Sequence, residues 1–473
     1  MTDRVAKLAL LAGAILFVPL LALFAYARPG YLSSESMLGG LIALELVLAA
    51  VWMYRSIFFP LVLLAFLFAG IDVPFGGIFT TGRWAFLIVG ACVGSFIMLK
   101  ERFGRFTLFH AVAFFAIFSA LVSAAVSRFP TFAFLKAVSL LLLFLYSATG
   151  ARISAAGREH RFVTGLLMGC EILVAVTAAY YFLGRELMGN PNSLGAVMGI
   201  VAPIILWGTL IDPTPMVRHR RLALYAICMY LLLRSQSRAG LLAGFISCGL
   251  LCLALRKYKL FGQGIVILLI VVTASAIFNP DAFSRTVSSL TSSVLYKDKD
   301  PNQGVFGSRR EPWRAAIDSI HKHVWFGSGF GTTDTGQDAS AHLSNYTTTA
   351  ASTSENGSSY LTIVSWVGII GVVPFAFVLL SLLNKILRTM LWMVHTHSPF
   401  HPAVPIAMAV VAGLIHAVFE DWLFASGYYM CVFFWTLAFV FVDVAPWAPL
   451  PSFSIPWRPV LMRQSMSGAA PSR

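Results

Sequence analysis

The sequence predicts an all-α protein that crosses a membrane many times. Of its 473 residues, 58% are hydrophobic and only 11% are charged, whereas about 25% of a soluble domain is charged. The apolar residues are gathered into runs that are separated by short polar or Gly/Pro-containing stretches. Most runs have the length that a helix needs to cross a bilayer, so we expect a polytopic membrane protein.

The lengths of the apolar runs predict about fourteen transmembrane helices. The first run follows Arg4 and Lys7 and lacks an Ala-x-Ala cleavage site, so we interpret it as a span and not as a signal peptide. The predicted spans lie near residues 6–27, 37–54, 57–79, 84–99, 107–126, 132–150, 162–183, 193–211, 221–234, 238–255, 261–278, 359–383, 403–421 and 423–445.

The placement of charge predicts how these spans are oriented. With the N-terminus in the cytoplasm, most Lys and Arg clusters fall on one side of the membrane, as the positive-inside rule requires. The polar stretches 190–192, 234–238 and 279–358 then share the opposite side. We therefore expect a transmembrane bundle of about eleven helices (1–278), one large non-cytoplasmic loop (279–358), C-terminal transmembrane helices (359–445) and a cytoplasmic tail (446–473).

The basic charge and the cysteines exclude several classes of protein. The net charge of +14 does not indicate a nucleic-acid partner, because the basic residues form short clusters between apolar runs. All six cysteines lie inside apolar runs and the long loop has none. Neither a disulfide framework nor a cysteine-ligated metal site is therefore expected.

The long loop is expected to contain an amphipathic helix. Pro312 suits its first position, and Gly327-Ser328-Gly329 ends it. Such a helix lies on a membrane surface or caps a helical bundle. Apolar residues repeat at the spacing of one helix face at Trp313, Ile317, Ile320 and Val324.

Arginines gather where the predicted spans meet the polar side. Arg234 and Arg238 follow a span, and Arg309 and Arg310 lie in the long loop. An ionised side chain in hydrocarbon costs roughly 3 kcal/mol or more, and a guanidinium binds phosphate oxygens through paired hydrogen bonds. If residues 234–238 are helical, their two arginines share one face. We expect a site for an anionic, membrane-borne group. The alternative is that the first pair extends to lipid headgroups and the loop arginines are solvated.

Four short motifs occur in order across residues 190–371. They are Asn190-Pro191-Asn192-Ser193-Leu194-Gly195, Leu233-Arg234-Ser235-Gln236-Ser237-Arg238-Ala239-Gly240, Ser308-Arg309-Arg310-Glu311-Pro312-Trp313 with Gly327-Ser328-Gly329, and Gly357-Ser358-Ser359-Tyr360-Leu361 with Gly368-Ile369-Ile370-Gly371. In sequence and in order, this set resembles the motifs of O-antigen ligase and O-antigen polymerase proteins. Each motif alone is a weak signal, and the set is fairly specific.

The resemblance implies a membrane-embedded glycosyltransferase that uses no metal and no other cofactor. Such enzymes transfer a glycan from an undecaprenyl-diphosphate donor to a sugar hydroxyl, on another glycan or on lipid A–core. They act among membrane lipids at the periplasmic face of the bacterial inner membrane, which would make loop 279–358 periplasmic. By their positions in the motifs, Arg238 and Arg309 would hold the diphosphate, and Arg234 and Arg310 would add substrate contacts.

The chain departs from the family pattern at one position. The histidine expected just before the Tyr360-Leu361 pair is absent, and counting back without a gap reaches Gly357. The nearest titratable residue is Glu355. We expect Glu355 to orient or deprotonate the acceptor hydroxyl, as a carboxylate does when it is placed on that hydroxyl. The alternative is an ordinary loop carboxylate near the start of a helix.

A second pair of polar residues lies near the outer end of a late span. His416 and Glu420 are four residues apart, so they share one face if the segment is helical. They would contribute further substrate contacts, or they would satisfy each other within the bundle.

A transporter, such as a flippase for lipid-linked sugars, is the alternative from another functional class. It requires charged residues at mid-membrane, broken helices and two related halves. The mid-span stretches here are mostly apolar, and Glu45 and Glu171 are the exceptions. Between the two transferases, the absent histidine slightly favours a polymerase over a ligase.

Overall fold

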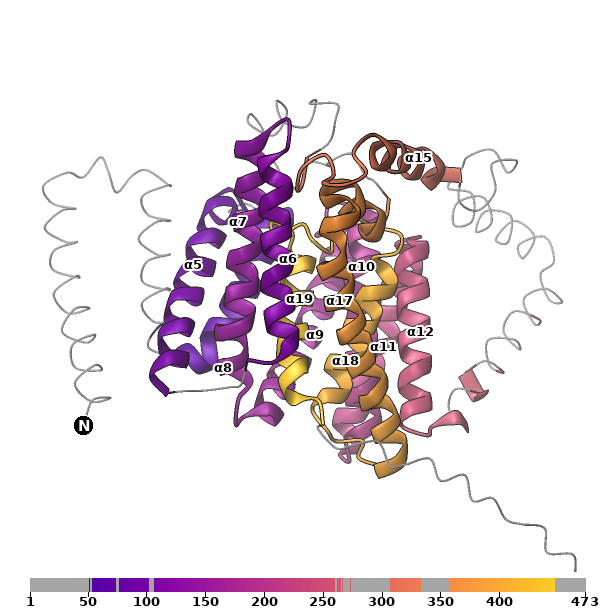
Figure 1. Ribbon diagram of the computed structural model, residues 1–473. Helices are drawn as coiled ribbons and strands as arrows, with labels where there is room; N and C mark the ends of the chain where they lie inside the picture. Colours follow the sequence, from indigo (N-terminus) through magenta and orange to yellow (C-terminus); the bar gives the residue numbers. More distant parts are fainter. Residues whose placement is uncertain are drawn as a thin grey trace, which may run out of the picture.

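The computed structural model describes residues 51, 53–73, 76–101, 106–259, 262–264, 266, 273, 307–332 and 357–446. Within these residues every regular element is a helix (Figure 1), which confirms the all-α prediction for this part of the chain. The predicted spans near 6–27, 37–54 and 261–278 lie wholly or largely outside it.

Six helical segments of the described chain are long and apolar enough to cross a membrane. The longest of them is α17, and several shorter apolar helices pack beside them. The total of about fourteen spans remains a prediction. The six segments are Gly82–Glu101 within α5 (Gly76–Glu101), α6 (Leu108–Ala125), Pro130–Ala155, which joins α7 (Pro130–Tyr146), η2 (Ser147–Ala151) and α8 (Arg152–Ala155), α9 (Glu159–Phe182), α10 (Pro191–Ile211) and α17 (Ser359–Thr396).

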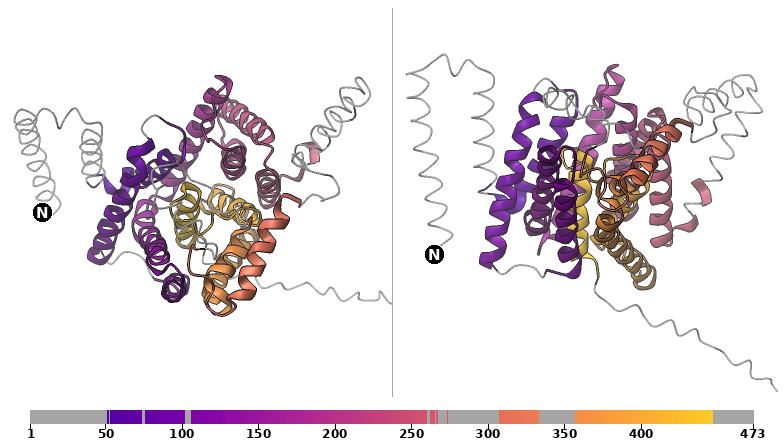
Figure 2. Two further views of the ribbon diagram at one scale, coloured as in Figure 1. Left: turned by 90° about the horizontal axis from the view of Figure 1, so that it is seen from above. Right: turned by 45° about the horizontal axis from the view of Figure 1, so that its top comes forward.

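The remaining helices complete a bundle around a fully buried centre. In the view from above in Figure 2, α18 (Ala403–His416) and α19 (Tyr429–Val444), drawn in yellow tones, lie inside a ring of other helices. Both bury side chains on nearly every side, as an all-round apolar helix does in the middle of a bundle. The outer helices include η1 (Tyr54–Phe58), α4 (Phe59–Gly70), α11 (Pro215–Arg234) and α12 (Arg238–Ala254), and α15 (Gly307–Lys322) lies across one end (Figure 1).

Several predicted boundaries were wrong. The span expected at 57–79 ends at Gly70, and α5 begins soon afterwards at Gly76, since Pro74 disfavours helix in the residue before it. The span expected at 359–383 continues to Thr396. The last helix begins at Tyr429 and not at 423, because residues 417–428 form a loop.

Helices α10 and α12 approach each other at backbone distance through four glycines. A Cβ placed on Gly199 would lie 2.6 Å from the carbonyl oxygen of Gly240, and one on Gly240 would lie 2.4 Å from that of Gly195. Gly244 faces Gly199 in the same way, with 3.4 Å from its added Cβ to the Cα of Gly199. This small-residue contact is typical of helix pairs in membranes. It brings the start of α10, where the Asn190 side chain accepts a hydrogen bond from the Asn192 amide (2.8 Å), against the start of α12.

Helix α17 is broken at Gly368, whose φ of +69° lies in the left-handed region. The break frees backbone groups that need partners, because lipid offers none. The chain after α15 supplies several of them. The amides of Ser328 and Gly329 donate to the carbonyls of Ser365 (2.9 Å) and Trp366 (3.1 Å), and the Ile369 amide donates to Val324 (2.9 Å).

Hydroxyl groups at the end of α6 fix the same junction. The Ser123 hydroxyl donates to the carbonyl of Trp366 (2.6 Å), and the Ser127 hydroxyl donates to that of Ser328 (3.0 Å). The loop is therefore held between α6 and the break in α17, and this anchored segment positions α15, which directly precedes it.

We predict that Gly240→Ala destabilises the protein, because the added methyl group would overlap the Gly195 carbonyl at the α10–α12 contact. Overpacking of this kind costs about 1–3 kcal/mol. A melting curve in detergent, read by fluorescence-detected size exclusion, should show a lower Tm. Gly169→Ala is the matched control, since its added Cβ meets nothing within 4 Å. Equal Tm values for the two variants would contradict the close contact.

Candidate active site

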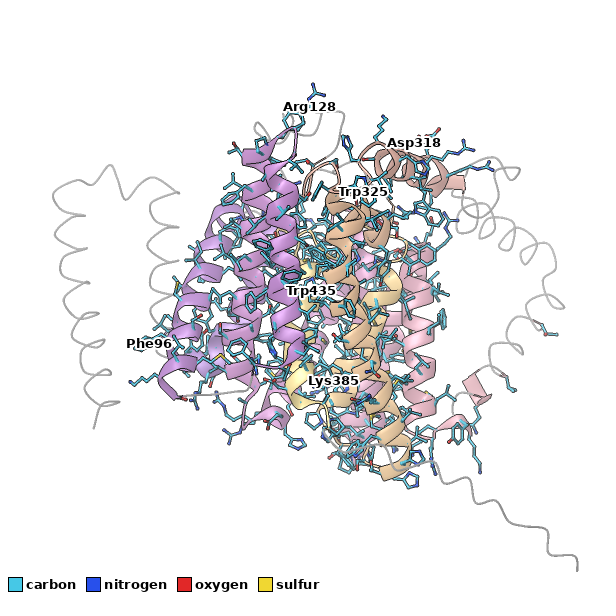
Figure 3. The ribbon with its side chains drawn as sticks, in the orientation of Figure 1. Phe96, Arg128, Asp318, Trp325, Lys385 and Trp435 are labelled. Carbon is cyan, nitrogen blue, oxygen red and sulfur yellow. The ribbon has the colours of Figure 1, made fainter. Side chains whose placement is uncertain are left out.

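The loop helix α15 lies at one end of the bundle. Figure 3 labels Asp318 on α15 and Trp325 after it at the same end as Arg128, which follows α6. Lys385, within α17, and Phe96, within α5, lie toward the opposite end. Asp318 and Trp325, both from the long loop, thus lie at the same end of the described bundle as Arg128.

The stretch from Arg234 to Arg238 is a turn and not a helix. Helix α11 ends at Arg234, Gln236 takes a positive φ of 52°, and α12 begins at Arg238. The Ser237 side chain caps α12 by accepting from the Gly240 amide (3.2 Å). The expectation that both arginines share one helical face was therefore wrong.

The two arginines consequently have different surroundings. Arg234 is exposed, and its Nε donates to the hydroxyl of Tyr181 (2.7 Å). Arg238 is half-buried at the first position of α12, where the positive charge of Arg309 acts on it. The turn thus separates the exposed Arg234 from the half-buried Arg238, which lies within electrostatic range of Arg309.

Arg309 is buried on α15 and forms an ion pair with Glu420. The side chains of both residues are nearly covered, at 11% and 13% exposure. Arg310 and Arg314 on the same helix are exposed. Of the loop arginines that the sequence singled out, Arg309 is the one directed into the protein.

Helix α15 differs from the predicted helix in its start, its end and its buried face. It begins at Gly307, so Pro312 lies inside it and removes one hydrogen bond near its start. It ends at Lys322, before Val324. Ile317, expected on the apolar face, is 42% exposed. The buried or half-buried face instead contains Arg309, Trp313, Ala316 and Ile320.

Gly357 is held by Arg309 and Trp313, which are one turn apart on α15. The indole Nε1 of Trp313 donates to the Gly357 carbonyl (3.0 Å). An added Cβ on Gly357 would lie 3.2 Å from Cδ of Arg309 and 3.2 Å from Nε1 of Trp313. The position that aligns with the expected family histidine is therefore occupied by backbone alone. Glu355 lies outside the described residues.

The predicted pair of His416 and Glu420 each has another partner. Nδ1 of His416 accepts from the indole of Trp422 (2.8 Å), and its Nε2 has no hydrogen-bond partner among the described residues. Glu420 pairs with Arg309, and its backbone carbonyl accepts from the Ser359 hydroxyl (2.6 Å). The two side chains therefore do not satisfy each other.

A group of hydroxyl side chains near Glu420 was not found by sequence reasoning. The Tyr428 hydroxyl donates to the Ser193 hydroxyl (3.0 Å) and lies 3.2 Å from the hydroxyl of Tyr429. Burial raises the pKa of Tyr428, and the charge of Glu420 raises it further. Ser193 belongs to the first motif, but no local pattern links it to a tyrosine more than two hundred positions later.

These contacts describe a site suited to an anion. Arg238 stands at the N-terminus of α12, where the helix dipole disfavours a cation and favours a negative charge. Arg309 adds a second guanidinium, which Glu420 balances within the protein. Among the described residues, no group of three or more His, Cys, Asp or Glu side chains is placed to hold a metal ion.

A comparison with protein families agrees with the motifs. Residues 222–376 match the family model described as O-antigen ligase. This segment, about a third of the chain, is the part that resembles the O-antigen ligase family. The resemblance seen in the sequence is thereby confirmed. No curated protein matched the chain.

The matched segment extends from α11 through α15 into α17 beyond its break. It includes Arg234, Arg238 and Arg309, whereas Ser193 and Glu420 reach the site from outside it. Together with the long apolar helices, this match supports a membrane enzyme of the O-antigen ligase and polymerase type.

We predict that Trp313→Phe loosens the contact between α15 and the start of α17, because the ring is kept but the donor to the Gly357 carbonyl is lost. Such a hydrogen bond contributes about 1 kcal/mol. Hydrogen exchange should quicken in the peptide that begins at Gly357. Trp325→Phe, at a 63% exposed position, is the control and should leave that peptide unchanged. Identical exchange in both variants would refute the role of Trp313.

Proposed function

We propose that this protein is a bacterial inner-membrane glycosyltransferase that transfers a glycan from an undecaprenyl-diphosphate donor to a sugar hydroxyl at the periplasmic face. The observation that carries the proposal is that Arg238, at the start of α12, lies within electrostatic range of Arg309 on α15. The two arginines come from separate motifs of the segment that matches the O-antigen ligase family. Two adjacent guanidiniums repel unless an anion lies between or beside them.

The departing diphosphate is the group that these arginines would stabilise. Breaking the bond to the anomeric carbon leaves additional charge on the diphosphate, and fixed donors that face this charge lower the barrier. Arginine suits the task because it stays ionised and presents paired donors to phosphate oxygens. The N-terminus of α12 adds its dipole in the same direction.

In this proposal, the other candidate residues contact the outer part of the substrate or act on the acceptor. The exposed Arg234 and Arg310 would contact the outer part of the substrate. The free Nε2 of His416 offers a neutral donor beside Arg309, whose charge acts on it. Glu355 would orient or deprotonate the acceptor, as expected from the sequence.

The proposed topology follows from the same orientation. About fourteen spans would cross the inner membrane, in the bundle at 1–278 and the helices at 359–445. Loop 279–358 would be periplasmic and the tail 446–473 cytoplasmic. The partners would be the lipid-linked donor, a glycan or lipid A–core acceptor, and membrane lipids.

The structure removes one observation that favoured a transporter. Glu171, unexplained in the sequence, forms ion pairs with Arg220 (2.7 Å) and Arg221 (2.7 Å). Arg221 also pairs with Asp212 (2.6 Å). A carboxylate engaged by two arginines of a neighbouring helix needs no transported ion to explain it. Glu45 lies outside the described residues.

A deletion strain separates the two kinds of transferase. Single repeat units on the lipid carrier would identify a polymerase, which the absent histidine slightly favours. Long chains on the carrier, together with bare lipid A–core, would identify a ligase. Unchanged glycan lengths on both carriers would contradict the proposed function. Rescue by the wild-type gene but not by Arg238→Ala would connect the phenotype to the site.

We predict that Arg238→Lys and Arg309→Lys each lower transfer about 100-fold or more, because lysine keeps the charge but loses the paired donors. Transfer would be measured with purified protein, lipid-linked donor and acceptor in vesicles. Arg314→Lys is the control on the exposed side of α15 and should retain wild-type transfer. Full activity of both site variants would exclude them from diphosphate stabilisation.

A further inference from the structure

We propose that the Glu420 carboxylate takes the proton of the acceptor hydroxyl, and that the donor diphosphate frees it for this task by replacing it on Arg309. The inference rests on the proposed function and assigns a further catalytic residue to the same site. Glu355 keeps an orienting role toward the acceptor.

The first step is the competition for Arg309. Its guanidinium is buried and paired with the Glu420 carboxylate. A diphosphate oxygen needs the same donors, because carboxylate and phosphate bind the guanidinium in the same paired geometry. The donor therefore cannot bind Arg309 fully while Glu420 holds it.

The second step is that the carboxylate can leave without moving its backbone. The Ser359 hydroxyl donates to the Glu420 carbonyl (2.6 Å) and accepts from the Leu423 amide (3.1 Å). The Ser359 amide donates to the carbonyls of Ala417 (3.0 Å) and Glu420 (3.1 Å). These bonds fix the loop at the start of α17, so an exchange of partners requires a new side-chain rotamer only.

The third step is the environment of the released carboxylate. Glu420 acts on Tyr428, whose hydroxyl belongs to the group formed with Ser193 and Tyr429. Hydroxyl groups that both donate and accept suit the hydroxyls of a sugar. The carboxylate is thus paired with the arginine that would bind the leaving group and lies within electrostatic range of a group of hydroxyls suited to the acceptor.

The reaction then balances without a further reagent. The acceptor oxygen forms a bond to the anomeric carbon while its proton passes to the Glu420 carboxylate. The bond between the anomeric carbon and the diphosphate oxygen breaks, and its electron pair stays on that oxygen. Undecaprenyl diphosphate leaves, Glu420 releases its proton to water, and the ion pair with Arg309 forms again.

Glu420→Gln tests the inference because it separates binding from transfer. The amide keeps the shape but cannot take a proton, and it competes less well than a carboxylate for Arg309. With full-length protein in vesicles, undecaprenyl diphosphate should bind at least as tightly as to wild type. Single-turnover transfer at saturating donor should fall about 100-fold or more. Glu311→Gln, exposed on α15, should change neither quantity.

The alternative, that Glu420 only holds Arg309 in place, predicts the opposite binding result. Weaker binding of undecaprenyl diphosphate with a parallel loss of transfer would overturn the inference, as would unimpaired transfer. Glu420→Asp keeps a carboxylate, so it should retain more transfer than the amide and remains informative if Glu420→Gln does not fold. If Glu420→Asp transfers glycan no faster than a folded Glu420→Gln variant, this result would also contradict a role of Glu420 as the general base.

Two further comparisons distinguish this inference from a proton-accepting role of Glu355 and from a failure of the proposed function. Glu355→Gln should raise the KM for the acceptor while single-turnover transfer at saturating acceptor stays near wild type. A large loss under those conditions, with Glu420→Gln active, would assign the proton to Glu355. If the proposed function fails, wild type itself neither binds undecaprenyl diphosphate nor transfers glycan, and the inference fails with it.

Discussion

The break in α17 at Gly368 is the constraint on which the candidate site depends. A helix interrupted within a membrane bundle must find partners for its freed amides and carbonyls. Here the chain after α15 supplies several of them, and the Ser123 hydroxyl of α6 supplies another. The loop is therefore anchored inside the bundle, and α15 is held across its end. Arg309 can be buried at a defined position because the segment directly after its helix is bonded to the break.

Arg238, the second arginine of the candidate site, is positioned by a separate set of contacts. The glycine contact between α10 and α12 fixes the start of α12, and the capped turn before it places Arg238 at the first position of that helix, within electrostatic range of Arg309. Substrate binding does not have to bring these two guanidiniums together. A site whose donors are already placed spends little free energy on reorganisation when charge develops in a transition state.

The sequence predicted the helices, the motifs and the arginines, but not how they contact each other. Apolar runs identify most helices because burial in lipid depends on local composition. The predicted common face for Arg234 and Arg238 was wrong because a turn lies between them, stabilised by the buried Ser235 and Ser237. Two capping serines in one short stretch were the signal for that turn.

Partner choice was the least predictable part. His416 and Glu420 have the spacing of a helical pair, yet α18 ends at His416 and the chain turns. His416 then accepts a hydrogen bond from Trp422, and Glu420 pairs with Arg309. No local spacing in the sequence indicates either partner. The predicted apolar stripe of α15 was right at Trp313 and Ile320 but wrong at Ile317, because the inner face includes the buried Arg309 and leaves Ile317 exposed. Tertiary contacts decided these cases against local pattern.

The pairing of Arg309 with Glu420 also bears on selectivity in a membrane crowded with phospholipids. A ligand must replace the carboxylate to reach Arg309. The electrostatic free energy that it gains therefore depends on how much more negative charge it brings than the carboxylate that it displaces. A phospholipid diester brings about one negative charge, which only equals what it displaces, whereas a diphosphate brings about two. The half-buried Arg238, within electrostatic range of Arg309, can bind the second negative charge of the diphosphate. In the proposed reaction, the ion pair between Arg309 and Glu420 therefore favours a diphosphate carrier over bulk lipid.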